Sequence, residues 1–332
     1  MDDIYSSGIQ FILWLQSLGE WIAYPMLFFS LLGTEIFYIL IAPAIYWLWN
    51  PALGLRLGLF LNLSGAINNI LKITFHQPRP YWYDKAVKAY TAESSYSIPS
   101  GHAQNAVVTW GTLAYYLPRK WGKTIAILLI FLISISRIFL GVHFPSDVLV
   151  GWLIGLVLLW AMIRLEAPVL EWMKKQSLGI QILTIFLASL SIILFGYLAL
   201  ATQGDWIVPP QWVEYAQLAF PDQAPINPQS LSRVVTSAGA FFGMALGGLW
   251  MYQKGGFSVK GLWWQLILRF IVGLIGALLI WLGLDMIFPD GETLIPVLLR
   301  FIRYALVGLW ITALAPMLFI KTRLISSHEN SI

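Results

Sequence analysis

The feature that most constrains this 332-residue chain is the recurrence of apolar stretches about as long as a membrane-spanning helix. A helix needs about 20 predominantly apolar residues to cross the hydrocarbon core of a bilayer, and several stretches reach that length. Charged residues make up only 11% of the chain, whereas they make up about a quarter of a soluble domain. We therefore predict an all-α fold, a polytopic transmembrane helix bundle.

The apolar pattern predicts nine or ten spans. Residues 4–19 would place apolar and polar side chains on opposite faces of a helix, which is typical of an amphipathic helix that lies in the membrane interface. The alternative is a first span from about Phe11 to Leu32. Further spans are expected near residues 27–48, 53–75, 101–118, 123–141, 146–165, 178–201, 233–253, 262–288 and 295–320.

Three short polar clusters interrupt the apolar pattern at the ends of predicted spans. Charged residues in membrane-spanning sequence are costly unless they are paired or functional. We therefore expect the clusters to converge on one phosphate-handling site at the membrane surface. The clusters are Lys72-x6-Arg79-Pro80, Pro99-Ser100-Gly101-His102 and Ser136-Arg137-x5-His143-x3-Asp147.

The first cluster supplies two cations that suit phosphoryl oxygens. Lys72 ends a predicted span whose polar face turns into the bundle. Arg79 lies between two prolines, which restrict the backbone around it. Its planar guanidinium matches the geometry of phosphate oxygens. Either side chain could instead extend to lipid headgroups.

The second cluster begins a predicted helix. Ser100 is a favourable N-cap, and Gly101 lets the backbone approach a ligand closely. The free N–H groups at such a helix start bind anions. His102 lies in the first turn and can donate a proton to a leaving group near neutral pH. The alternative is a capped helix start with an interfacial histidine.

The third cluster combines a cation with a histidine and a carboxylate. Arg137 closes one span, and Asp147 lies in the first turn of the next, where a carboxylate is favoured. His143 precedes Asp147 by four residues, so the carboxylate can hold one imidazole nitrogen. That contact would stabilise the cation formed during phosphoryl transfer. Asp147 could alternatively be only a helix cap.

Together the three clusters resemble the signature of the type 2 phosphatidic acid phosphatase superfamily. That superfamily includes lipid phosphate phosphatases and vanadium haloperoxidases. The resemblance covers roughly residues 28–165, and Asp147 and Gly151 match its usual continuation. Gln77 departs from it, because many members have a basic residue there. Residues 32–47 are similar to the first span of the sphingosine-phosphate phosphatase branch.

The resemblance implies a role for each matching residue. His143 attacks phosphorus and carries the phosphoryl group as phosphohistidine, Asp147 orients His143, and His102 protonates the leaving oxygen. It also implies that no metal and no other cofactor takes part. The phosphate-binding residues are Lys72, Arg79, Ser100, Gly101 and Arg137.

Loop charges predict the orientation of the bundle. The side richer in Lys and Arg should be cytoplasmic, so the clusters face the periplasm, a lumen or the exterior. The proline-rich loop 202–231, on the cluster side, cannot be one long helix and either shields the site or only connects spans. The expected parts are an N-terminal interfacial or first spanning helix (1–26), a membrane phosphatase core (27–165), a basic cytoplasmic linker (166–177), additional transmembrane helices (178–321) and a cytoplasmic tail (322–332).

We predict an integral-membrane, metal-independent phosphatase that hydrolyses a lipid phosphate monoester or diphosphate. Its expected partners are that lipid and the bilayer; the scattered net charge of +4 gives no footprint for nucleic acid. The particular lipid and the oligomeric state stay open. The alternatives are a phosphatase for a small soluble ester, a catalytically silent relative and a vanadate-dependent oxidase. A transporter or channel for a lipid or anion is a further alternative, suggested by Arg269, Asp285, Arg300 and Arg303 near the late spans.

Overall fold

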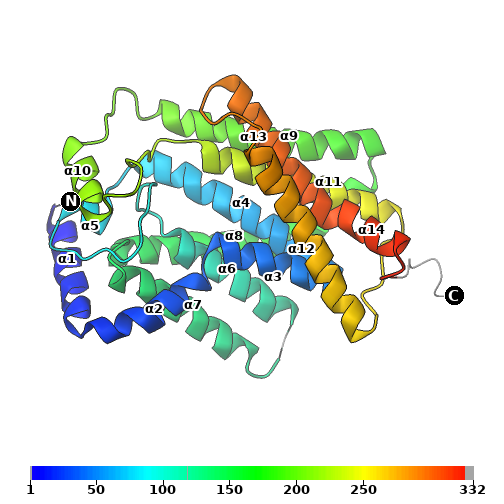
Figure 1. Cartoon of the computed structure of the whole chain (residues 1–332), viewed down its shortest axis with the longest axis horizontal. Helices are drawn as coiled ribbons and strands as arrows, with labels where there is room; N and C mark the ends of the chain where they lie inside the picture. The colour runs from blue at the N-terminus through cyan, green and yellow to red at the C-terminus, as the bar shows by residue number, and fades with distance from the viewer. Residues whose placement is uncertain (1, 118, 326–332) are drawn as a thin grey trace. The chain divides into compact units, whose positions relative to one another are not determined.

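The computed structural model describes residues 2–117 and 119–325, and the regular elements in these ranges are all helices (Figure 1). The all-α fold predicted from the sequence is confirmed. The described residues form two compact units, each assembled from separate stretches of sequence. Unit 1 comprises residues up to Phe37, Ile67–Arg164 and Phe195–Ser230, and unit 2 comprises Tyr38–Ala66, Leu165–Leu194 and residues from Leu231 onward.

Unit 1 carries the three polar clusters. Its own helices are α1 (Asp2–Ser17), a 3₁₀ turn (Glu20–Ile22), α2 (Ala23–Leu31), α5 (Pro80–Tyr83), α6 (Gly101–Tyr116), α7 (Gly122–Phe139) and α10 (Pro210–Ala219). Four longer helices contribute residues to both units. They are α3 (Glu35–Leu48), α4 (Pro51–Phe75), α8 (Pro145–Lys174) and α9 (Leu178–Ala201).

Six helices in the described ranges are long and apolar enough to cross a membrane. A seventh candidate is the pair Glu20–Leu31 and Glu35–Leu48, which is bent by 44° at its break. Two predicted spans form as helices but do not qualify: α4 carries several polar residues, and α6 has only 16 residues. The count of nine or ten spans therefore stays a prediction. The six are α7, α8, α9, α11 (Ser232–Gln253), α12 (Trp263–Asp285) and the stretch Leu294–Lys321.

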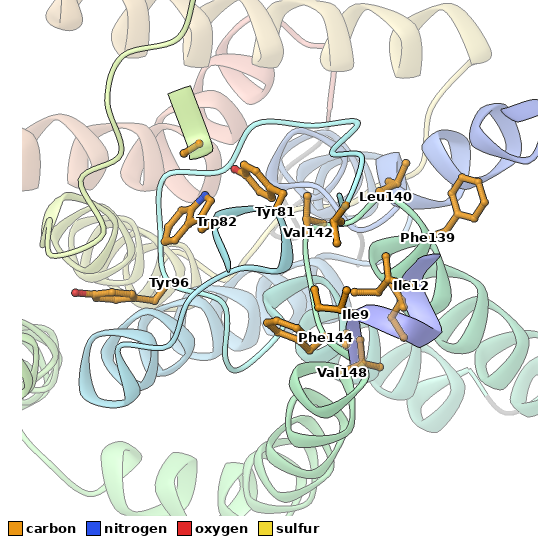
Figure 2. Packing of buried hydrophobic residues seen from close by; sticks show 14 of the residues in the cluster. Ile9, Ile12, Tyr81, Trp82, Tyr96, Phe139, Leu140, Val142, Phe144 and Val148 are labelled. Atoms are coloured by element: carbon orange, nitrogen blue, oxygen red, sulfur yellow. The ribbon is translucent and has the colours of Figure 1, made fainter. Parts of the chain in front are cut away.

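Helix α1 packs along one side against unit 1, while its expected place in the membrane interface stays a prediction. Ile9 and Ile12 are buried in the hydrophobic core of unit 1, and Figure 2 shows them beside Phe144 and Val148. The chain does not continue as one helix from α1 into α2. Gly19, with a φ of 124°, lies at the break, and this conformation favours glycine. The alternative span from about Phe11 to Leu32 is therefore interrupted.

Helix α8 is longer than the sequence suggested. It continues from Pro145 through Lys174, so most of the expected linker at 166–177 is helical. Pro168 lies inside it and removes one backbone hydrogen bond without ending the helix. Lys174, one of the basic residues that marked a linker, therefore lies in the last turn of a helix.

Unit 2 is built around α11 and α13 (Leu294–Leu309), which pack against each other. A Cβ at Gly239 would lie 2.5 Å from the Phe301 carbonyl oxygen, so glycine permits the close approach. After α13 the chain makes a π-helical turn (Trp310–Leu314) and then α14 (Ala315–Lys321). Tyr46 Oη donates to Thr312 O of this turn at 2.7 Å. Of the predicted tail at 322–332, residues 326–332 lie outside the described ranges.

Candidate active site

The three polar clusters meet within unit 1. A backbone hydrogen bond of 2.9 Å from Ser100 N to Asp147 O joins the second cluster to the third. The residues come from five helix ends. Lys72 is in the last turn of α4, Arg79 precedes α5, Ser100 caps α6, Arg137 is in the last turn of α7 and Asp147 is in the first turn of α8.

A glycine brings α6 and α8 close together beneath the site. A Cβ placed on Gly151 would lie 2.7 Å from Ser100 O and 3.2 Å from Ala103 Cβ. Real Cβ atoms do not approach a carbonyl oxygen so closely, so only glycine fits here without a shift of the backbone. Gly151 is also one of the residues that matched the continuation of the signature.

Asp147 is placed to hold the His143 imidazole. Its Oδ2 lies 3.3 Å from His143 Nδ1 and accepts hydrogen bonds from Phe144 N at 2.8 Å and Ser97 Oγ at 2.5 Å. Ser97 Oγ lies 3.2 Å from His143 Nδ1. Because the Ser97 hydroxyl donates to Asp147, both contacts of Nδ1 are satisfied when Nδ1 carries the proton. His143 Nε2 then keeps its lone pair.

The surroundings of His143 favour its neutral form. Burial lowers the pKa of His143 well below its ordinary value, and the positive charges of Arg79 and Lys72 lower it further. Arg79 Nη1 lies 3.5 Å from His143 Nε2. The Nε2 lone pair of the neutral imidazole therefore faces a guanidinium that donates to it at long range and that can instead hold an anion.

Lys72 and Arg79 are oriented by the loop that precedes α6. Lys72 Nζ donates to Tyr96 O at 2.6 Å and to Ser97 O at 3.3 Å. Arg79 donates from Nε to Ser95 O at 2.7 Å and from Nη2 to Tyr96 O at 3.3 Å. Both side chains are buried. Backbone carbonyl groups of residues 95–97 thus fix the direction of both cations.

Glu93 joins two of the arginines. Its Oε1 forms an ion pair with Arg137 Nη2, and its Oε2 lies 3.4 Å from Arg79 Nη2. Arg137 Nη1 also donates to Ser30 Oγ at 2.6 Å. The Glu93 side chain is 16% exposed, and the two arginine side chains are 2% exposed or less. One carboxylate thus offsets part of the positive charge of two buried arginines, which would otherwise be more costly to bury.

His102 lies in the first turn of α6. Ser100 is the N-cap of this helix, as predicted, and its Oγ accepts from Ala103 N at 3.5 Å. His102 Nε2 is buried and has no hydrogen-bond partner among the described residues. The ring packs against Gly33, where a Cβ would lie 2.8 Å from His102 Cδ2. An imidazole nitrogen without a partner, next to this cluster of charges, is available to contact a bound group.

Sequence reasoning missed the acidic and hydroxyl residues of the loop before α6. Ser97 contacts both members of the His143–Asp147 pair, and Glu93 links two arginines. The polar run Glu93-Ser94-Ser95-Tyr96-Ser97, just before the second cluster, was the available signal. Its length and polarity are also typical of an ordinary surface loop, so the run alone does not indicate a role.

The late charges that suggested a transporter have partners within unit 2. Arg303 forms an ion pair with Asp285, and Arg300 Nη2 lies 3.6 Å from Asp290 Oδ1. Arg269 is fully buried and donates to backbone carbonyl groups at 2.6 to 3.0 Å. These contacts account for the buried charges by local structure, so they no longer favour a transport pathway.

Among residues 2–117 and 119–325, no group of three or more His, Asp or Glu side chains gathers in a way that could hold a metal ion. The site is instead rich in cations, with Lys72, Arg79 and Arg137 around His143. Such a set of donors binds oxyanions. It does not resemble the carboxylate sites that hold divalent metals.

Two family profiles match separate parts of the chain. The profile described as the PAP2 superfamily matches residues 53–169, and the profile described as "PAP2 superfamily phosphatase, transmembrane extension" matches residues 235–328. The first match contains all three polar clusters. The second lies within unit 2. The segment between them, which holds α10, belongs to neither match.

Curated relatives are similar to the region of the clusters. Phosphatidylglycerophosphatase B of Bacillus subtilis is 33% identical over 37% of this chain and 62% of its own length. The undecaprenyl-diphosphatase of Sulfolobus acidocaldarius is 28% identical, over 43% and 69%. Sphingosine-1-phosphate phosphatase 2 of Mus musculus is 31% identical, over 41% and 40%. The chain therefore spans only about 62% of the first of these relatives and less than half of the third.

One solved structure is also similar to the chain. It is a crystal structure described as the first transmembrane PAP2-type phosphatidylglycerolphosphate phosphatase from Bacillus subtilis. The identity is 27%, and the superposition covers 51% of this chain and 88% of that chain with a TM-score of 0.43.

Proposed function

Because this chain belongs to the PAP2 superfamily, we propose that it is a phosphatase acting on a lipid phosphate monoester or diphosphate. The relatives named above are phosphatases of phosphorylated lipids, which supports this substrate class. The multi-pass membrane architecture suits a substrate whose tail stays in the bilayer. The observation that carries the proposal is the position of His143, whose Nε2 lies beside Arg79 while its Nδ1 lies beside Asp147.

In the first step, His143 Nε2 attacks the phosphorus. An Nε2–P bond forms, and the bond between phosphorus and the leaving oxygen breaks. His102 gives a proton to that oxygen, so a monoester leaves as the lipid alcohol and a diphosphate leaves as the lipid monophosphate. The imidazole becomes a cation when it carries the phosphoryl group, and Asp147 stabilises that cation through Nδ1. Ser97 keeps the carboxylate in place by donating to its Oδ2.

In the second step, a water molecule attacks the phosphohistidine. His102, now deprotonated, accepts a proton from that water, while the N–P bond breaks and returns the lone pair to His143 Nε2. Inorganic phosphate leaves. The two steps restore both histidines to their starting protonation states, so the cycle balances without a further reagent.

The cations supply the electrostatic part of catalysis. Charge spreads over the phosphoryl oxygens in the transition state, and fixed positive groups stabilise it. Lys72, Arg79 and Arg137 are the candidates for this role, with the N–H groups of Ser100 and Gly101 at the start of α6. Three fixed cations can do what a divalent ion does elsewhere, so we expect activity without added metal.

The orientation of the site in the membrane is a separate part of the proposal. The excess of basic residues in the other loops supports a site on the non-cytoplasmic side. Since the chain has no cysteine, single substitutions can report this directly. Lys85→Cys, just after α5, should react with a membrane-impermeant maleimide from outside intact cells. Lys120→Cys, between α6 and α7, should react only after lysis.

The test is phosphate release by the purified protein in detergent, with EDTA present, across a panel of lipid phosphates and diphosphates. We expect release from at least one lipid, loss of release in His143→Ala, and unchanged release in the matched control His328→Ala, whose site lies outside the described residues. Release that requires a metal would contradict the metal-free mechanism. No release from any phosphorylated lipid would contradict the proposed activity.

A further inference from the structure

The 202–231 segment lies between the two family matches and is built onto the active-site unit. Its helix α10 packs against α5, and Figure 1 shows the two helices side by side. Gln203 Nε2 donates to Ile73 O at 2.5 Å, at the end of α4. Gln229 Nε2 donates to Gln203 Oε1 at 2.8 Å and to Trp206 O at 3.3 Å. Both ends of the segment are therefore fixed to each other and to α4.

Trp206 is inserted among aromatic side chains next to the site. Its Nε1 donates to Tyr96 Oη at 3.2 Å. Its ring lies 4.8 Å from the His76 ring and 6.0 Å from the Trp212 ring, measured between centroids. Tyr96 is fully buried and belongs to the cluster drawn in Figure 2. A buried phenol needs a hydrogen-bond partner, and Trp206 supplies one.

Tyr96 connects this aromatic contact to the phosphate-binding cations. Its backbone carbonyl accepts from Lys72 Nζ at 2.6 Å and from Arg79 Nη2 at 3.3 Å. The same residue thus meets Trp206 with its side chain and both cations with its main chain. A shift of the Tyr96 backbone would turn the carbonyl away from the cations, and the packed side chain restrains the backbone from shifting.

The 202–231 segment has a second contact near Arg79, through the ring of Trp82. Trp82 is fully buried, and the Arg79 guanidinium carbon lies 5.8 Å from its ring centroid. Trp212 of α10 lies 6.5 Å from the Trp82 ring. The segment therefore packs beside both the carbonyl and the aromatic ring that Arg79 contacts.

We propose that Trp206 is a positioning residue for phosphate binding. Its N–H fixes Tyr96, and the Tyr96 carbonyl in turn orients Lys72 and Arg79 toward the phosphoryl group. The inference rests on the proposed function. Trp206 touches no reacting atom, and its hydrogen bond to Tyr96 Oη is the contact that we expect to carry its effect to the cations. The 202–231 segment is then part of the phosphate site, beyond its role as a connector.

The test is a pair of substitutions that remove the same hydrogen bond from its two ends. Trp206→Phe keeps an aromatic ring but loses the donor, and Tyr96→Phe keeps the ring but loses the acceptor. Because a buried hydrogen bond of this kind is worth about a factor of ten, each change should lower kcat/KM about tenfold. Each should also raise the inhibition constant of orthovanadate about tenfold, because vanadate binds the same cations without a lipid tail.

The inhibition constant separates a positioning role from a loss of folded protein. A smaller fraction of folded protein lowers the rate of hydrolysis but leaves the inhibition constant unchanged. If the two residues act through one bond, the double variant should lose no more than either single variant. Tyr215→Phe is the control, since it removes a side-chain hydrogen-bond donor from α10, in the same segment, as Trp206→Phe does. We expect it to keep the wild-type constant.

A wild-type vanadate constant in both Trp206→Phe and Tyr96→Phe would overturn the inference. Losses that add in the double variant would also overturn it, because they would show that the two residues act independently. Neither result affects the proposed function, which stands or falls on phosphate release by the wild-type protein.

Discussion

Glu93 offers a direct way to test how the site holds an anion. Its carboxylate already pairs with both Arg79 and Arg137, so phosphoryl oxygens have to compete with it for both guanidinium groups. Glu93→Gln keeps the size of the side chain and removes its charge. We expect the variant to bind inorganic phosphate more tightly than the wild-type protein does, because this competition is weaker.

The magnitude follows from the geometry. Two unit charges 3.4 Å apart, the distance from Glu93 to Arg79, attract each other by about 5 kcal/mol at an effective dielectric constant of about 20. Desolvation of a buried pair offsets most of this attraction. A net effect of about 1.4 to 3 kcal/mol corresponds to a tightening of about tenfold to more than a hundredfold.

The same substitution should destabilise the protein when no anion is bound. It leaves Arg79 and Arg137 buried without a counter-charge, so Tm should fall in phosphate-free buffer. Phosphate should then raise Tm more in the variant than in the wild-type protein, because it binds the folded state more tightly. The exposed Glu20, which pairs with Lys88, provides the control Glu20→Gln.

The assay combines phosphate inhibition of lipid hydrolysis with thermal unfolding across a phosphate titration. The expected result is a lower inhibition constant for phosphate in Glu93→Gln and no change in Glu20→Gln. An inhibition constant for phosphate that is unchanged or higher in Glu93→Gln would refute the reasoning. It would show that Glu93 helps to arrange the arginines and does not compete with the anion.

Three further predictions follow from the site. Asp147→Asn should lower kcat by at least about a hundredfold with little change in KM, because an amide can donate to Nδ1 and so favour the wrong tautomer of His143; near-normal turnover would contradict this. Lys72→Met should move the acidic limb of the kcat/KM profile to higher pH, because a positive charge that lowers the pKa of His143 is lost. The acidic limb of the wild-type protein should lie below about pH 6.5, the ordinary pKa of histidine. The same lipid is used for both proteins, so that the ionisation of the lipid affects both profiles equally. An unchanged limb in the variant would count against His143 as the titrating group. Gly151→Ala should lower Tm and activity because its Cβ would meet Ser100 O at 2.7 Å, whereas Gly179→Ala, which has open space around it, should keep both; equal behaviour of the two variants would contradict the packing argument.

The parts of the account that could be predicted depend on local pattern. The length of the apolar stretches predicted the helices. The spacing of four residues between His143 and Asp147 predicted the contact between their side chains at the start of α8. Ser100 was predicted as an N-cap because capping needs only neighbouring residues. The cost of charged residues at span ends predicted that the distant clusters would meet, and the resemblance to a three-part signature predicted the same.

The parts that could not be predicted depend on contacts between residues far apart in sequence. Glu93 binds Arg137, and Trp206 binds Tyr96, but neither pairing leaves a periodic pattern. The length of α8 was missed for a different reason. Basic residues and Pro168 are typical of a linker, yet a helix that extends past the membrane can carry both at its polar end.

The most direct test of the central claim is to trap the covalent intermediate. Purified protein is mixed with a turned-over lipid phosphate, quenched within milliseconds in alkali, digested and analysed by mass spectrometry. The account predicts an acid-labile phosphoryl group on His143 that accumulates in the wild-type protein and is absent from His143→Ala. A phosphoryl group on a different residue, or hydrolysis that continues in His143→Ala, would contradict it.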